Sequence, residues 1–163
     1  MKAIVEILNK LNEVFADFDK KVLEDSINWA SNRRNKLSEY MKSPEYKDKS
    51  VPYVVRYNKA VDIAGGKVWY NAMYGSNLEM LENFVIKNCE AISKRRNASI
   101  AKKLEKAGVK EVISEEFIIS ANGFEGYFGI NCDSGVKKVH ISSILAGGYN
   151  VQCLHNRVLV KIK

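Results

Sequence analysis

The residues in this sequence most able to do chemistry are basic, and they concentrate between Ala91 and Lys110. Seven of these 20 positions are basic and one, Glu105, is acidic, so the segment carries a net charge of +6, against +7 for the whole chain. The basic residues are Lys94, Arg95, Arg96, Lys102, Lys103, Lys106 and Lys110. A concentrated basic surface raises the local electrostatic potential and favours a polyanionic partner, whereas scattered lysines mainly maintain solubility.

Helical spacing predicts how these side chains are arranged. Arg96, Lys103 and Lys110 follow one another at intervals of seven residues, and Arg95 and Lys102 form a neighbouring row. Long cationic side chains on successive turns can follow a phosphate backbone. Two other interpretations stay open, namely the solvated outer face of a bundle helix and a surface for an acidic protein partner.

A second basic cluster, Arg33-Arg34 with Lys36, lies close in sequence to Trp29 and Tyr40. Aromatic and cationic side chains together can hold nucleic-acid bases by stacking, although such aromatic residues more often pack inside a fold. We therefore predict a binding surface for nucleic acid, or for a protein complex that handles nucleic acid. The predicted binding residues are Arg33, Arg34, Arg95, Arg96, Lys102, Lys103 and Lys106.

The two histidines, His140 and His155, suggest a different chemistry. If neighbouring strands bring them together near Glu125 or Asp133, they could act as acid and base in RNA cleavage or share a metal ion. Their separation of 15 residues specifies no known site. The sequence holds no complete catalytic, metal-binding or phosphate-loop signature. We therefore predict a protein that is not an enzyme and that needs no metal or cofactor.

Composition excludes several further classes of protein. Cys89, Cys132 and Cys153 are far apart and form no Cys-x-x-Cys pair, so we expect small buried or half-buried thiols rather than disulfides or a zinc site. The chain has no run of about 18 apolar residues, and charged residues interrupt its first 25 positions. These features argue against a membrane span and a signal peptide, and we expect a cytoplasmic protein.

The first part of the chain has helical periodicity. Apolar residues recur at spacings of three and four from Ile4 to Val22, which predicts a helix that begins near Lys2 and ends before Ser43-Pro44. This helix needs a partner surface, which is either its own domain or a second copy in a dimer. Residues 44–52 contain both prolines and are expected to form a loop.

Two short helices and one long helix are predicted next. Residues 53–74 favour a short helix, a turn at Gly65-Gly66 and another short helix. Ser76 and Glu79 have the spacing of a capping box and predict a helix from Ser76 to Ala107, with Gly108 as its stop. A break near residues 97–99 would divide this helix in two.

After Gly108 the periodicity changes from 3.6 to 2. Phe124, Gly126, Phe128 and Ile130 alternate with more polar positions, and turn residues follow at hairpin spacing, which predicts an antiparallel sheet of four or five strands from about Val112 to Lys163. The fold is therefore expected to be α+β. We predict a helical part over residues 1–110, with its basic helix at 91–110, packed with a β lobe over residues 111–163 as one folded unit.

The segment from Ile144 to Lys161, which contains Gly147-Gly148, His155 and Arg157, resembles the C-terminal ends of uncharacterised small proteins encoded by bacteriophages. The resemblance implies a context rather than active residues, because small phage accessory proteins commonly bind nucleic acid or block a host defence complex. We predict a nucleic-acid-binding protein. The alternatives are a protein-binding inhibitor or adaptor that acts on a host complex, and a small hydrolase or nuclease that uses the two histidines.

Overall fold

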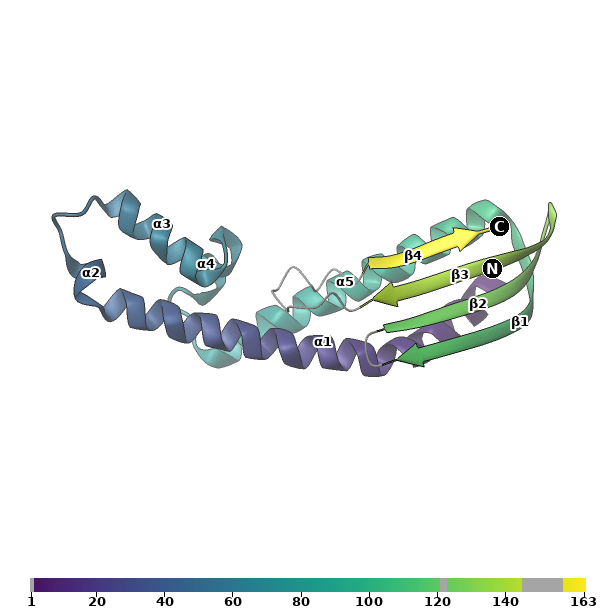
Figure 1. Cartoon of the computed structure of the whole chain (residues 1–163), viewed down its shortest axis with the longest axis horizontal. Coiled ribbons are helices and arrows are strands. Elements are labelled where there is room, and N and C mark those ends of the chain that lie inside the picture. Colours follow the sequence, from purple (N-terminus) through teal and green to yellow (C-terminus); the bar gives the residue numbers. More distant parts are fainter. Residues whose placement is uncertain (1, 121–122, 145–156) are drawn as a thin grey trace. The chain divides into compact units, whose positions relative to one another are not determined.

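The computed structural model describes residues 2–120, 123–144 and 157–163, and it has the expected α+β architecture (Figure 1). The helices are α1 (Lys2–Lys42), α2 (Pro44–Lys47), α3 (Tyr53–Ala64), α4 (Lys67–Met73) and α5 (Leu78–Ala107). The strands are β1 (Val109–Ser120), β2 (Gly123–Cys132), β3 (Gly135–Ile144) and β4 (Arg157–Ile162).

Contacts along the chain define two compact units. One consists of Met1–Val22 and Cys89–Lys163, and the other of Leu23–Asn88. The division does not follow the change from helix to strand near residue 110, because α1 and α5 each contribute residues to both units. We refer to them as the sheet unit and the helical unit and describe each by itself.

The sheet unit is built on an antiparallel meander. Within the described residues the strand order is β1-β2-β3-β4, so every neighbouring pair is consecutive in the chain. The register pairs Tyr127 of β2 with Glu116 of β1 and with His140 of β3, and His140 in turn with Lys161 of β4. These four residues therefore lie in one row on one face of the sheet.

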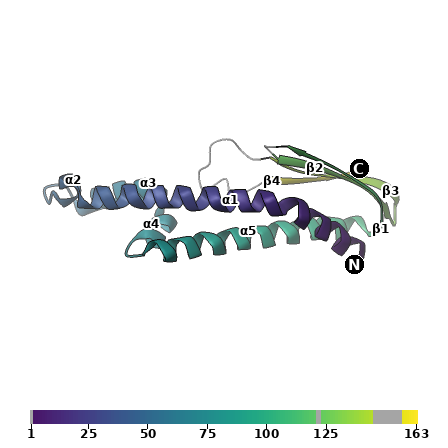
Figure 2. The ribbon, with the colours of Figure 1, turned by 90° about the horizontal axis from the view of Figure 1, so that it is seen from below.

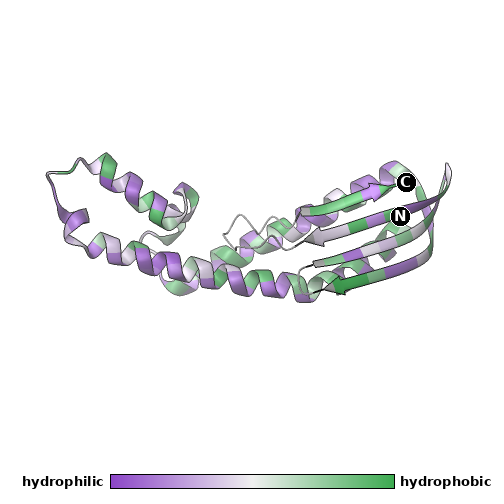
Figure 3. Cartoon of the chain, in the orientation of Figure 1, coloured by the Kyte–Doolittle hydropathy of each residue, from purple (hydrophilic) through white to green (hydrophobic). Residues whose placement is uncertain are grey.

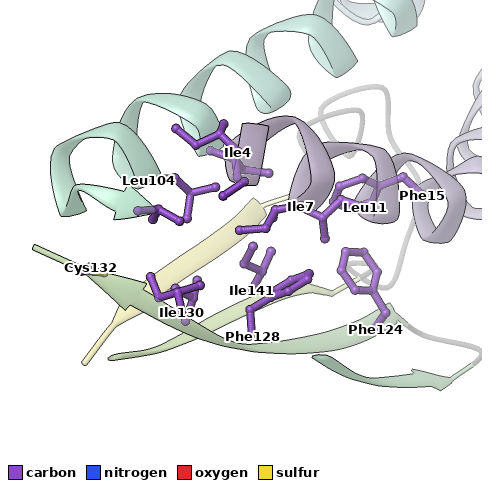
Figure 4. Packing of buried hydrophobic residues seen from close by; sticks show 14 residues of the cluster. Ile4, Ile7, Leu11, Phe15, Leu104, Phe124, Phe128, Ile130, Cys132 and Ile141 are labelled. Carbon is purple, nitrogen blue, oxygen red and sulfur yellow. The ribbon is translucent and has the colours of Figure 1, made fainter. Parts of the chain in front are cut away.

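The core of the sheet unit lies between the other face of the sheet and two helices. Ile4, Ile7, Leu11 and Phe15 of α1 and Ile100 and Leu104 of α5 pack with Phe124, Phe128, Ile130, Val139 and Ile141 of the sheet. Figure 4 shows the side chains of both layers pointing toward one another, and Figure 2 shows both helix segments on the same side of the sheet. The predicted alternation in β2 is confirmed, since Phe124, Phe128 and Ile130 are buried. The apolar stripe of α1 over residues 4–15 thus faces the chain's own sheet.

Contacts between aromatic rings join the helices of the helical unit. Trp29 of α1 contacts Trp69 of α4 edge to face, with ring centroids 5.5 Å apart, and Trp69 contacts Phe84 of α5 at 5.2 Å. The chain leaves α3 at Gly65, whose φ of 99° favours glycine, and a Cβ there would lie 2.6 Å from the Trp29 ring. The prediction of a helix, a turn at Gly65-Gly66 and a second helix is confirmed.

Three details of the long helices differ from the sequence-based expectations. The capping residue of α5 is Asn77, whose Oδ1 accepts from the Met80 amide at 2.8 Å, whereas the Ser76 hydroxyl donates to the Met73 carbonyl at 2.8 Å. The capping box at Ser76 was therefore wrong by one residue. Helix α5 continues without a break through residues 97–99, and α2 forms a single turn within the expected loop.

Hydrophobic and hydrophilic residues alternate along both long helices (Figure 3). Among the described residues, accordingly, no helix has an apolar stretch long enough to cross a membrane.

Replacement of Leu104 tests the packing of α5 in the sheet unit. Leu104 is fully buried, so Leu104→Ala is expected to lower the free energy of unfolding by about 2–5 kcal/mol through lost burial and the cavity left behind. Met80 lies on the same helix and is 57% exposed, and Met80→Ala is expected to cost below about 0.5 kcal/mol. Urea denaturation of both variants measures the difference. Equal losses would contradict this account of the core.

Candidate nucleic-acid interface

The C-terminal half of α5 places its basic residues by burying the opposite side of the helix. Ile100 and Leu104 enter the core of the sheet unit. At 3.6 residues per turn, Lys102, Arg95 and Lys106 fall within about 40° of one another around the helix axis, roughly opposite Leu104. Lys103 lies about 60° from Lys106, on the flank of this row. All four cationic residues are exposed.

We call Arg95, Lys102, Lys103 and Lys106 the basic face. Among the described residues, none of the four forms a salt bridge or a hydrogen bond through its side chain. The row from Arg95 to Lys106 extends over about 16 Å of helix. The four cations of the basic face therefore have no salt-bridge partner among the described residues, and the exposed acidic residue nearest to them along α5 is Glu105, three residues after Lys102.

Arg96 has a different role from its neighbours. Its side chain is 6% exposed, and its Nη1 and Nη2 donate to the two carboxylate oxygens of Asp19 at 2.8 and 3.0 Å. Its guanidinium carbon also lies 3.7 Å from the centroid of the Phe15 ring, a close cation–π contact. Both partners are on α1. This guanidinium stabilises the packing of α1 against α5 and is not available to a ligand.

The predicted row of Arg96, Lys103 and Lys110 does not form. Arg96 is buried, and Lys110 lies beyond the end of α5, in β1. The helix ends at Gly108, whose φ is 70° and whose amide donates to the Glu105 carbonyl at 3.0 Å. Lys110 instead forms an exposed salt bridge of 2.9 Å with Asp133. The neighbouring row that starts at Arg95 is the one that stays exposed.

The second predicted cluster lies in the helical unit, where its two arginines contact backbone carbonyl groups of the same unit. Arg33 donates to the Ile63 carbonyl at 3.4 Å and lies 5.3 Å from the centroid of a Trp29 ring, while Arg34 donates to the Ser76 carbonyl at 2.9 Å. Trp29 is held between Trp69 and Gly65. Arg33 therefore joins α1 to the last turn of α3, and Arg34 joins it to the segment between α4 and α5, so we leave both out of the proposed interface.

The candidate acid–base residues of the sheet come together in part. His140 Nε2 lies 4.0 Å from Glu125 Oε2, and the His140 ring lies 4.7 Å from that of Tyr127. The Tyr127 hydroxyl donates to Glu125 at 3.0 Å, which raises the pKa of Tyr127. Asp133 is not in this cluster, because it pairs with Lys110. His155, the other half of the predicted pair, lies outside the described residues.

Neither of the two cysteines within the described residues has the surroundings of a reactive thiol. Cys89 is half-buried, and burial raises the pKa of its thiol to about 11, so the thiol stays protonated at neutral pH. Cys132 is buried in the core, and Cys153 lies outside the described residues. Within the part of the chain that the structure describes, no three His, Cys, Asp or Glu residues are grouped so as to hold a metal ion.

Ser99 is the residue of this surface that sequence reasoning missed. It is exposed on α5 between Arg95, four residues before it, and Lys102 and Lys103, three and four residues after it. Residues at these separations are neighbours on a helix surface. Helical projection of every polar residue in the segment, and not of the basic ones alone, would have placed Ser99 within the basic face.

No protein-family model matches the chain, and neither the curated proteins nor the solved structures provide a significant match. The resemblance of residues 144–161 to phage-encoded proteins falls mostly on residues outside the described ranges and stays a prediction.

Replacement of Asp19 tests the structural role of Arg96. Asp19→Ala leaves a buried guanidinium without its counter-charge, and because the Asp19 side chain is itself 32% exposed, we expect the free energy of unfolding to fall by about 2–3 kcal/mol, less than for a fully buried pair. Asp17 is exposed on the same helix and has no polar partner among the described residues, so Asp17→Ala is expected to cost below about 0.5 kcal/mol. Thermal and urea denaturation measure both values. A loss at Asp19 no larger than that at Asp17 would show that Arg96 does not depend on this pair.

Proposed function

We propose that this protein binds nucleic acid through the basic face of α5, by contacts between its cationic side chains and backbone phosphates. The observation that carries the proposal is that four exposed cations lie together over about 16 Å with no acidic partner in the described structure. Nucleic-acid duplexes carry one negative charge per roughly 1.7 Å of axis, so a row of this length faces several phosphates.

The main competing explanation is an ordinary solvated helix face. The exposed side of α1 in the same sheet unit shows what such a face looks like, because its charged residues include both signs, namely Glu6, Glu13, Asp17 and Lys20. On α5, by contrast, residues 91–107 contain one acidic residue, Glu105, and Lys106 lies four residues after Lys102 and three after Lys103. Like charges at these separations destabilise a helix by about 0.2–0.5 kcal/mol per pair. The helix dipole compensates this cost only in the last turn, which contains Lys106 but not Arg95.

The chemistry of the basic face favours contacts with the backbone over contacts with bases. Residues 91–107 contain no aromatic residue on which a base could stack. Asn97, whose amide could read a base edge, donates instead to the Asn12 side chain at 3.0 Å. Binding is therefore expected to tolerate many sequences and to weaken steeply as salt is added.

Removal of the exposed row tests the proposed function. The triple variant Arg95→Gln, Lys102→Gln, Lys106→Gln is expected to bind a short DNA or RNA duplex about 100-fold more weakly at low salt, because three phosphate contacts and their counterion release are lost. The control is Lys2→Gln, Lys20→Gln, Lys21→Gln, which removes the same charge from exposed positions of α1. Fluorescence anisotropy measures the affinities. Undetectable binding by the unmodified protein, or equal losses in the two variants, would refute the proposal.

A second candidate function, a protein-binding inhibitor or adaptor, is favoured by one feature of the helical unit. Tyr53, Val54 and Val55 at the start of α3 are 61%, 60% and 52% exposed. Three consecutive exposed apolar residues are uncommon on a surface without a partner. Arg56 holds this turn in place by donating to the carbonyls of Tyr46 at 2.8 Å and Val51 at 3.2 Å. These two hydrogen bonds therefore hold the exposed apolar residues in a fixed position.

Affinity capture with nuclease treatment separates the two functions. If the protein acts as an adaptor, a specific partner remains bound after nuclease digestion and is lost from the variant Val54→Glu, because the new charge would be desolvated at the interface. The matched control Asn83→Glu adds the same charge to an exposed position of α5 in the same unit, on a different helix from Val54, and should retain the partner. Loss of all partners on digestion would argue against the adaptor function.

A further inference from the structure

Ser99 lies near the centre of the basic face. In helical projection it is about 20° from Lys106 and 40° from Arg95 and Lys103, and the cations lie on both sides of it. Arg95, Lys102 and Lys103 are three or four residues away, which places their Cβ atoms about 5–6 Å from that of Ser99. The one neutral polar residue of this surface is therefore surrounded by positive charges.

The Ser99 hydroxyl is free to bind a ligand. A serine within a helix can donate to the carbonyl four residues earlier. In this chain the Ser43 and Ser76 hydroxyls, which lie between helices, donate to carbonyls three residues earlier. In the described structure the Ser99 hydroxyl has no hydrogen-bond partner, although it is exposed.

We infer that Ser99, together with Arg95, Lys102 and Lys103, forms the seat of one backbone phosphate. The hydroxyl donates a hydrogen bond to a phosphate oxygen at the floor of the seat, while the three longer side chains surround the same group with positive charge. Hydrogen bonds to an ionised acceptor are about twice as strong as those between neutral groups. The inference rests on the proposed function and goes beyond it, because it fixes where on the basic face a phosphate lies and assigns a role to a neutral residue.

The seat makes a prediction that a diffuse positive surface does not. A neutral donor releases no counterion, whereas each cationic contact to duplex DNA contributes about −0.9 to the slope of log K against log salt. Loss of the Ser99 hydroxyl should therefore weaken binding at every salt concentration without changing that slope. Loss of Lys102 should change both.

The experiment measures binding of a short DNA duplex as a function of salt by fluorescence anisotropy. Ser99→Ala is expected to bind about tenfold more weakly with an unchanged slope. Ser99→Thr keeps the hydroxyl and should bind within about threefold of the unmodified protein, and Lys102→Gln should reduce the slope by about 0.9. Circular dichroism confirms that each variant retains its helices.

A charge-matched pair gives the sharpest comparison. Ser99→Asp places an anion in the seat, whereas Ala98→Asp adds the same charge at the adjacent exposed position, about 100° away around the helix, where it neighbours Arg95 and Lys102 but not Lys103. We expect Ser99→Asp to reduce affinity more than Ala98→Asp, because it removes the hydroxyl and places a carboxylate beside all three cations of the seat, where it repels the phosphate at short range. Equal effects of the two substitutions, or unimpaired binding by Ser99→Ala, would overturn the seat and leave the basic face as the site. If the unmodified protein binds no duplex, the proposed function itself fails, and the seat fails with it.

Discussion

The ion pair between Arg96 and Asp19 determines which side chains of α5 face the solvent. It joins two helices of the sheet unit through a nearly buried, bidentate ion pair that lies on the ring of Phe15. Together with Ile100 and Leu104, it fixes the rotation of α5 about its own axis. With that rotation fixed, Arg95, Lys102 and Lys106 have to point away from the sheet. The exposed charge of this surface is thus a consequence of how the core packs.

Much of the fold followed from periodicity in the sequence. The spacing of Ile4, Ile7, Leu11 and Phe15 predicted both the first helix and its buried side, and the alternation of Phe124, Phe128 and Ile130 predicted the inner face of the sheet. These patterns are reliable because burial of apolar area imposes them directly. The N-cap of α5 was misplaced because Ser76 and Asn77 are both good capping residues. In the structure the Ser76 hydroxyl donates to the Met73 carbonyl at the end of α4, and Asn77 caps α5.

The candidate site was less accessible to sequence reasoning. Arg96 looks like any other basic residue in the segment, and its acidic partner lies 77 residues earlier in the chain, so the sequence cannot show that it is buried. Arg33 and Arg34 contact backbone carbonyl groups, and because every residue has one, the sequence does not indicate which residues are the partners. Cationic residues are equally suited to ligands and to backbone carbonyls, and tertiary structure alone separates the two uses. The basic face therefore keeps four of the seven predicted binding residues, all of them on one side of α5.

The central claim is that the basic face binds phosphates, and the salt dependence of binding tests it most directly. Four cationic contacts to a DNA duplex predict that log K falls with log salt with a slope of about −3.6, and that binding weakens steeply toward physiological salt. The measurement is a titration of the unmodified protein against a short duplex at a series of salt concentrations. A slope near zero, or no binding at the lowest salt, would contradict the claim and identify the exposed cations of α5 as an ordinary solvated surface.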